Sequence, residues 1–105
     1  MSNVIELTTE KFDSTIKKGD WVVDFWASWC GPCKMMGPEF EAAARELKGK
    51  VHFGKVNVED HFEISDRFNI MSIPTTMFFK EGRMITAHTG ALSKAEILHF
   101  VEENL

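Results

Sequence analysis

The segment WVVDFWASWCGPCK, residues 21–34, decides the fold because an apolar run passes through a short turn into a helical pattern. The β-branched and aromatic residues at 21–27 are typical of a central strand that is covered on both faces. Cys30 follows the turn, and Pro32 fits the first turn of a helix, where its missing N–H is not needed. We therefore predict a strand, a short loop and a helix that carries the two cysteines of the chain at its start.

The composition is that of an ordinary globular protein. The chain has 105 residues, of which 44% are hydrophobic and 27% charged, and this balance excludes disordered, collagen-like and coiled-coil classes. The length suits a single domain over residues 1–105. The net charge is −4 and no basic run is present, so we expect no nucleic-acid partner.

The hydropathy pattern predicts no association with a membrane. No window approaches the roughly 18 apolar residues that a spanning helix needs. The first twelve residues, MSNVIELTTEKF, lack the basic and apolar regions that are typical of a signal peptide. We therefore expect a cytoplasmic protein.

Strand and helix patterns alternate through the first half of the chain. Further strands are expected at residues 4–7, 51–58, 75–80 and 83–89, and further helices after residues 8–9, at about 61–68 and after residue 93. Thr8 or Thr9 is expected to cap the first helix, and Ser93 forms a capping box with Glu96 at the start of the last. Helical crossovers require parallel strands, while the hairpin at 75–89 is antiparallel. We predict an α/β fold in which a central five-stranded mixed sheet is flanked by four helices.

Cys30 and Cys33 could form a redox pair, half of a metal site, or two inert core residues. A zinc or iron–sulfur site needs further ligands, but the chain has no second C-x₂-C, and its four histidines lie in different predicted elements. Residues three apart share a helix face, so the two sulfurs can close a disulfide. The helix N-terminus lowers the pKa of the Cys30 thiol, which makes Cys30 the predicted nucleophile. We expect Cys33, with less access to solvent, to be the resolving thiol.

Asp24 lies in the middle of the apolar run at 21–27. A carboxylate that is buried without a partner loses its hydration, so its pKa should be raised and it should hold a proton near neutral pH. The alternative is an aspartate at the edge of the sheet that reaches solvent.

Three motifs carry a resemblance to a known family: WCGPCK at residues 29–34, IPT at 73–75 and GALSK at 90–94. They occur in the order and at the separations of the thioredoxin family, and the resemblance covers essentially the whole chain. It implies the thioredoxin fold and a general protein disulfide reductase that is re-reduced by a thioredoxin reductase. No dinucleotide or flavin motif is present, so we expect no cofactor in this chain and a monomer that acts on disulfide-containing proteins.

The resemblance also implies roles for single residues. Asp24 would assist proton transfer at Cys33 through water, and Lys55 matches the family lysine near that aspartate. A lysine that extends to solvent is the alternative for Lys55. Ile73 would pair through its backbone with an extended substrate strand, and Pro74 would be cis, although X-Pro bonds are mostly trans.

A flat apolar patch is implied as the substrate-docking surface. Its members are Trp29, Gly31, Pro32, Gly90 and Ala91. The alternative for Gly90 and Ala91 is a role in turn formation and helix capping only. Trp26 is expected to pack beneath the site. The pair Met71-Ser72 departs from the family pattern, because a cation often found at this rim is missing. This affects the choice of partner and not the reaction type.

The dipeptide between the cysteines predicts the direction of electron flow. Gly31-Pro32 offers no side-chain donor or charge that would stabilise the Cys30 thiolate, so the pair should be reducing. An oxidant or isomerase would need a higher redox potential. A third possibility is a binding module that uses the apolar patch without turnover.

Overall fold

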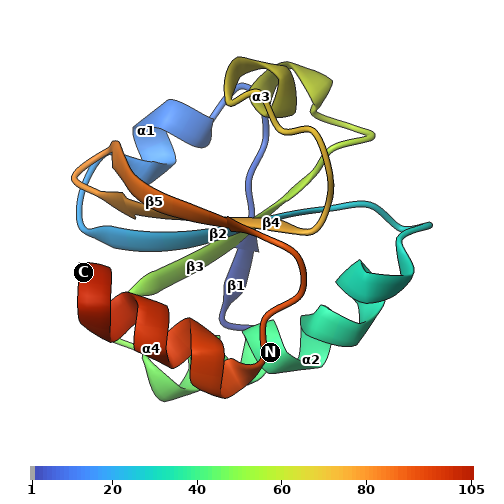
Figure 1. The fold of residues 1–105 in the computed structure, drawn as a ribbon. Coiled ribbons are helices and arrows are strands. Elements are labelled where there is room, and N and C mark those ends of the chain that lie inside the picture. The colour runs from blue at the N-terminus through green and yellow to red at the C-terminus, as the bar shows by residue number, and fades with distance from the viewer. Residues whose placement is uncertain (1) are drawn as a thin grey trace.

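The computed structural model describes residues 2–105 and contains one mixed sheet flanked by helices. The elements are β1 (Val4–Glu6), α1 (Phe12–Ile16), β2 (Asp20–Trp26), α2 (Gly31–Glu46), β3 (His52–Asn57), α3 (Phe62–Arg67), β4 (Thr75–Lys80), β5 (Arg83–Thr89) and α4 (Lys94–Asn104). The strand order is β1-β3-β2-β4-β5, and α1 and α3 cover one face while α2 and α4 cover the other (Figure 1). The predicted five-stranded mixed sheet with four helices is confirmed.

Strand β2 lies at the centre of the sheet, parallel to β3 and antiparallel to β4. Successive side chains of a strand point to opposite faces. Val22 packs into the core beneath α2 and α4, whereas Val23 and Phe25 pack into the core beneath α1 and α3. Asp24 therefore faces α2, the helix that carries the cysteines.

Two local signals are confirmed at the C-terminal half of the chain. Glu81 and Gly82 join β4 to β5 with φ of 51° and 82°, the positive values of a tight hairpin turn. Ser93 accepts a hydrogen bond from the Glu96 N–H at 3.1 Å, and its own N–H donates to the Glu96 carboxylate at 2.9 Å. This is the expected capping box.

Among residues 2–105, no helix is both long and apolar enough to cross a membrane.

The expected cap of the first helix is wrong. Helix α1 begins at Phe12 after Lys11, which makes no side-chain cap. Thr8 instead accepts the Lys11 N–H at 3.3 Å and so closes a turn ahead of the helix. Thr9 is engaged by a distant residue, because its N–H and hydroxyl lie 3.2 and 3.0 Å from His61 Nδ1.

Candidate redox site

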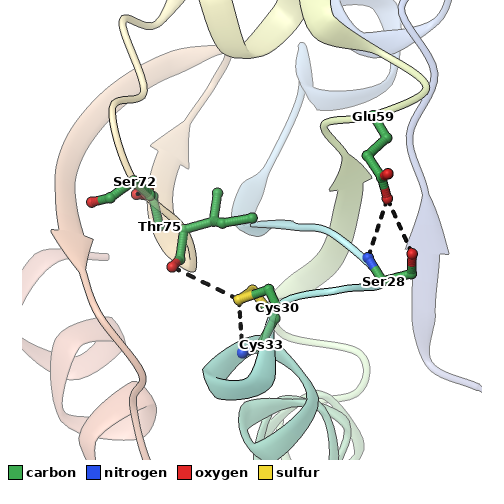
Figure 2. Close-up of a disulfide and its surroundings, with 7 residues drawn as sticks. Ser28, Cys30, Cys33, Glu59, Ser72 and Thr75 are labelled. Atoms are coloured by element: carbon green, nitrogen blue, oxygen red, sulfur yellow. Dashed lines mark hydrogen bonds between the residues drawn. A yellow bond between two sulfur atoms is a disulfide. The ribbon is translucent and has the colours of Figure 1, made fainter.

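Cys30 is the N-cap of α2 and Cys33 lies in the first turn, joined to it by a disulfide. Their Cα atoms are 5.2 Å apart. The Cys33 N–H donates to Cys30 Sγ at 3.2 Å (Figure 2). Gly31 and Pro32 complete the turn and are exposed. In the dithiol form, the same N–H and the helix dipole favour negative charge on Cys30.

The predicted difference in solvent access between the cysteines is wrong, since both are only 4% exposed in the disulfide form. Ile73 covers Cys30, and its carbonyl oxygen lies 3.8 Å from Cys30 Sγ. Ala27 and Val58 pack against the same pair. The two residues are therefore equally buried, and the hydrogen bond to Cys30 Sγ distinguishes them. Within residues 2–105, no group of three or more His, Cys, Asp or Glu side chains could hold a metal ion.

The turn before Cys30 is fixed by contacts to the residues that follow β3. The Val58 N–H donates to the Trp26 carbonyl at 2.9 Å. The Ser28 hydroxyl and N–H reach the Glu59 carboxylate at 3.1 and 3.4 Å (Figure 2). These contacts hold the segment that presents Trp29, whose side chain is 67% exposed.

The segment that faces the cysteines contains a cis peptide bond between Ile73 and Pro74, as the resemblance implied. The Thr75 hydroxyl donates to the Ser72 carbonyl at 2.6 Å and fixes the loop in front of this bond. The Gly90 N–H donates to the Pro74 carbonyl at 2.8 Å, and Gly90 has a φ of 109°, which only glycine adopts readily. The structure thus joins residues 73–74 and 90 beside the disulfide, while Ala91 is exposed next to them.

Asp24 is buried, with 5% of its surface exposed, so the alternative of an edge aspartate is wrong. Burial raises the pKa of Asp24 from 3.8 to about 7, and the charge of Lys55 opposes this rise. Among the described residues, its Oδ1 has no hydrogen-bond partner. Asp24 and Cys33 line the same cavity of about 190 Å³. A water molecule occupies about 30 Å³, so the cavity has room for water between the two groups.

Lys55 is half-buried opposite Asp24 on β3 and lines the same cavity. Its Nζ lies 5.3 Å from the centroid of the Trp26 ring, within the range of a cation–π contact. The indole Nε1 of Trp26 is buried without a partner among residues 2–105. Asp24, Cys33, Lys55 and Trp26 therefore line one cavity.

Glu41 also lines this cavity and was missed by the sequence reasoning. The Ser2 hydroxyl donates to both of its carboxylate oxygens, at 2.7 and 2.9 Å. Helix spacing could have indicated it, because Glu41 lies four residues after Gly37 on α2, and both residues line this cavity.

A disulfide at a helix N-terminus, beside a cis-proline and near a buried carboxyl group, defines a thiol–disulfide oxidoreductase. The family model for Thioredoxin matches residues 3–103. The chain belongs to the thioredoxin family.

Two curated relatives extend the match over essentially the whole chain. The chain is 37% identical over 107 residues to Thioredoxin from Buchnera aphidicola subsp. Acyrthosiphon pisum (strain APS), with coverage of 100% of this chain and 99% of the relative. It is 34% identical over 105 residues to Thioredoxin from Pseudomonas aeruginosa (strain ATCC 15692), with coverage of 98% and 97%. The protein is thus a thiol–disulfide redox carrier of this family.

Proposed function

We propose that the protein is a general protein disulfide reductase in which Cys30 is the nucleophile and Cys33 the resolving thiol. The observation that carries this assignment is the hydrogen bond from the Cys33 N–H to Cys30 Sγ at 3.2 Å. A donor aimed at one sulfur lowers the pKa of that thiol and raises its thiolate fraction. Gly31 and Pro32 add no charge to this stabilisation, which supports a reducing pair.

The reaction proceeds by two thiol–disulfide exchanges. The Cys30 thiolate attacks one sulfur of the substrate disulfide, forms a mixed disulfide and releases the other substrate sulfur as a thiolate, which takes up a proton. Cys33 then loses its proton and attacks Cys30 Sγ, which releases the second substrate thiol. Two electrons and two protons pass to the substrate, and the Cys30–Cys33 disulfide remains. A thioredoxin reductase supplies the electrons that restore the dithiol.

Asp24 is the proposed proton acceptor for Cys33 in the second exchange, acting through water. A carboxyl group with a pKa of about 7 can both accept and release a proton near neutral pH. The positive charge of Lys55 stabilises the ionised form of Asp24 and so lowers its pKa, whereas burial raises it. Lys55 therefore acts through Asp24 and is a positioning residue. The shared cavity supports this route.

Substrates are proposed to dock on the exposed patch around the disulfide. Trp29, Gly31, Pro32 and Ala91 are exposed, and Gly90 is half-buried between them and residue 74. Among residues 2–105, the N–H and C=O of Ile73 have no backbone partner. This supports pairing of Ile73 with an extended substrate segment next to Pro74.

The cytoplasm is the proposed location, because a reducing compartment keeps a carrier of this kind in its dithiol form. We propose that the carrier acts as a monomer, so that its docking patch stays free for substrates and reductase.

The test is to trap the first intermediate. Cys33→Ser removes the resolving thiol, so this variant should accumulate covalent substrate complexes that dithiothreitol releases. Cys30→Ser is the matched control and should accumulate none. If Cys33→Ser also traps nothing while the wild type reduces insulin, the assigned roles are wrong.

Two further measurements separate the alternatives. A glutathione redox titration should give a reducing potential, whereas an oxidising one would indicate an oxidant or isomerase. A double Cys30→Ser, Cys33→Ser variant with full biological activity would indicate a binding module.

A further inference from the structure

Three ionisable residues form a row across β1, β3 and β2. Glu6 is paired in register with Lys55, and Lys55 is paired in register with Asp24. We propose that Glu6 is a positioning residue for the second exchange, because it attracts the Lys55 ammonium and so limits the stabilisation that Lys55 gives to the Asp24 carboxylate. This inference rests on the proposed role of Asp24 in the reductase reaction and adds a residue that controls it.

The strand register places the three side chains on one face of the sheet. The preceding row of the same strands lies two residues earlier, packs into the core on the side of α2 and α4, and consists of Val4, Phe53 and Val22. Residues two apart in a strand point to the same face. Glu6, Lys55 and Asp24 therefore point to the face that α2 covers.

Lys55 lies between two cavities and lines both of them. The cavity of about 190 Å³ contains Asp24, and a second cavity of about 110 Å³ is lined by Glu6. Among residues 2–105, no ion pair includes Lys55. Its Nζ instead lies 5.3 Å from the centroid of the Trp26 ring. Neither carboxylate holds the ammonium, so it can turn toward either one.

Burial decreases along the row from Asp24 to Glu6. Asp24 is 5% exposed, Lys55 is half-buried and Glu6 is exposed. Neighbouring strands lie about 5 Å apart, so about 10 Å separates the strands that carry the two carboxylates. Lys55 lowers the pKa of Asp24 against the effect of burial. A negative charge on β1 that draws Lys55 away from Asp24 therefore raises this pKa, and the repulsion between the two carboxylates acts in the same direction.

Four other ionisable groups line the two cavities: Lys34 and Glu41 on α2, and Asp60 and His61 after β3. Hydrogen bonds with Ser2 and Thr9 hold Glu41 and His61. Asp60 is the other carboxylate of the second cavity, but it lies in a turn and not opposite Lys55. Glu6 is therefore the carboxylate that the sheet aligns with Lys55 on the side away from Asp24.

The first test measures the pKa of Asp24 in the oxidised protein by carbon-13 NMR of its carboxyl carbon. Glu6→Gln should lower this pKa by about 0.5, whereas Glu6→Asp keeps the charge and should retain most of the wild-type value. Asp60→Asn is the matched control, because it removes a charge from the same cavity but not from the position opposite Lys55. Its effect should be less than half as large.

A double substitution tests whether Glu6 acts through Lys55. Lys55→Met should raise the pKa of Asp24, because the carboxylate loses its neighbouring positive charge. Glu6→Gln added to Lys55→Met should have less than half of the effect that it has in the wild type, since only the direct repulsion between the carboxylates is then removed.

The second test follows the exchange itself. Reduced protein is mixed with the aromatic disulfide dithiobis(nitrobenzoate), which releases one thionitrobenzoate on attack by Cys30 and a second on attack by Cys33. The second release should be about twofold faster in Glu6→Gln than in the wild type at about pH 6.5, because a larger fraction of Asp24 is ionised. At about pH 8.5 the two rates should be equal, since Asp24 is ionised in both proteins.

The outcomes separate the role of Glu6 from that of Asp24. An unchanged pKa of Asp24 in Glu6→Gln, an equal change in Asp60→Asn, or an undiminished effect in the Lys55→Met background would each overturn the role of Glu6 and leave the proposed function intact. A lowered pKa of Asp24 without any change in the second release would refute proton transfer by Asp24 itself.

Discussion

Replacement of Asp24 by asparagine is expected to stabilise the protein at neutral and alkaline pH. Burial raises the pKa of Asp24 from 3.8 to about 7. Between these two values the folded protein holds a proton that the unfolded chain has released, so the free energy of unfolding falls as the pH rises. At about 1.4 kcal/mol per pKa unit, this loss reaches about 4 kcal/mol above pH 7. Asparagine has nearly the same shape and no charge, so the variant escapes the loss.

The assay is urea unfolding of the oxidised proteins, in which the cysteines do not titrate. The advantage of Asp24→Asn should be small at about pH 4 and should approach about 4 kcal/mol at about pH 8. Asp20→Asn is the matched control, since Asp20 lies at the half-exposed first residue of the same strand, and its effect should not grow in this way. An Asp24→Asn advantage that is equal at both pH values would refute the reasoning.

Two further substitutions test the packing and the caps. Gly54→Ala should lower the free energy of unfolding by about 1–3 kcal/mol, because a Cβ at this position would lie 2.7 Å from Leu7 Cδ1. Gly37→Ala is its control, because the added Cβ would meet no other part of the protein within 4 Å. Glycine destabilises a helix relative to alanine, so this variant should raise the free energy of unfolding by about 0.5–1 kcal/mol in the same urea assay. Ser93→Ala should lower the free energy of unfolding by about 1 kcal/mol, because the Glu96 N–H loses its acceptor; a thermal melt that is unchanged would contradict the role of this cap.

Strand β2 shows which structural features the sequence pattern can predict. A strand that is covered on both faces needs no polar alternation, and the five residues at 21–25 are all buried. The same pattern predicted the burial and the raised pKa of Asp24, because the penalty for an isolated buried carboxylate depends on its surroundings and not on one particular contact. The hairpin bounds were also predictable, since Glu81-Gly82 specifies the turn locally.

The features that were missed depend on contacts between distant segments. Contacts from Val58 and Ile73, which lie far from the cysteines in the chain, contribute to the burial of both cysteines. Thr9 forms a hydrogen bond with His61, which lies 52 residues away, and so does not cap α1. Helix and strand periodicity describes neighbours along the chain and is silent about such contacts.

The burial of Asp24 and its proposed role in proton transfer are two effects of the same environment. The apolar surroundings that raise its pKa to about 7 also destabilise the protein above that pH, and an uncharged residue at this position would be more stable. The cavity beside it leaves Asp24 Oδ1 and Trp26 Nε1 without protein partners among the described residues, which a filled core would avoid. Stability alone therefore does not explain the arrangement, whereas the proposed proton transfer at Cys33 uses both the raised pKa and the room for water. The same Asp24→Asn variant should consequently gain stability while its mixed disulfides persist longer, because the second exchange loses its proton acceptor.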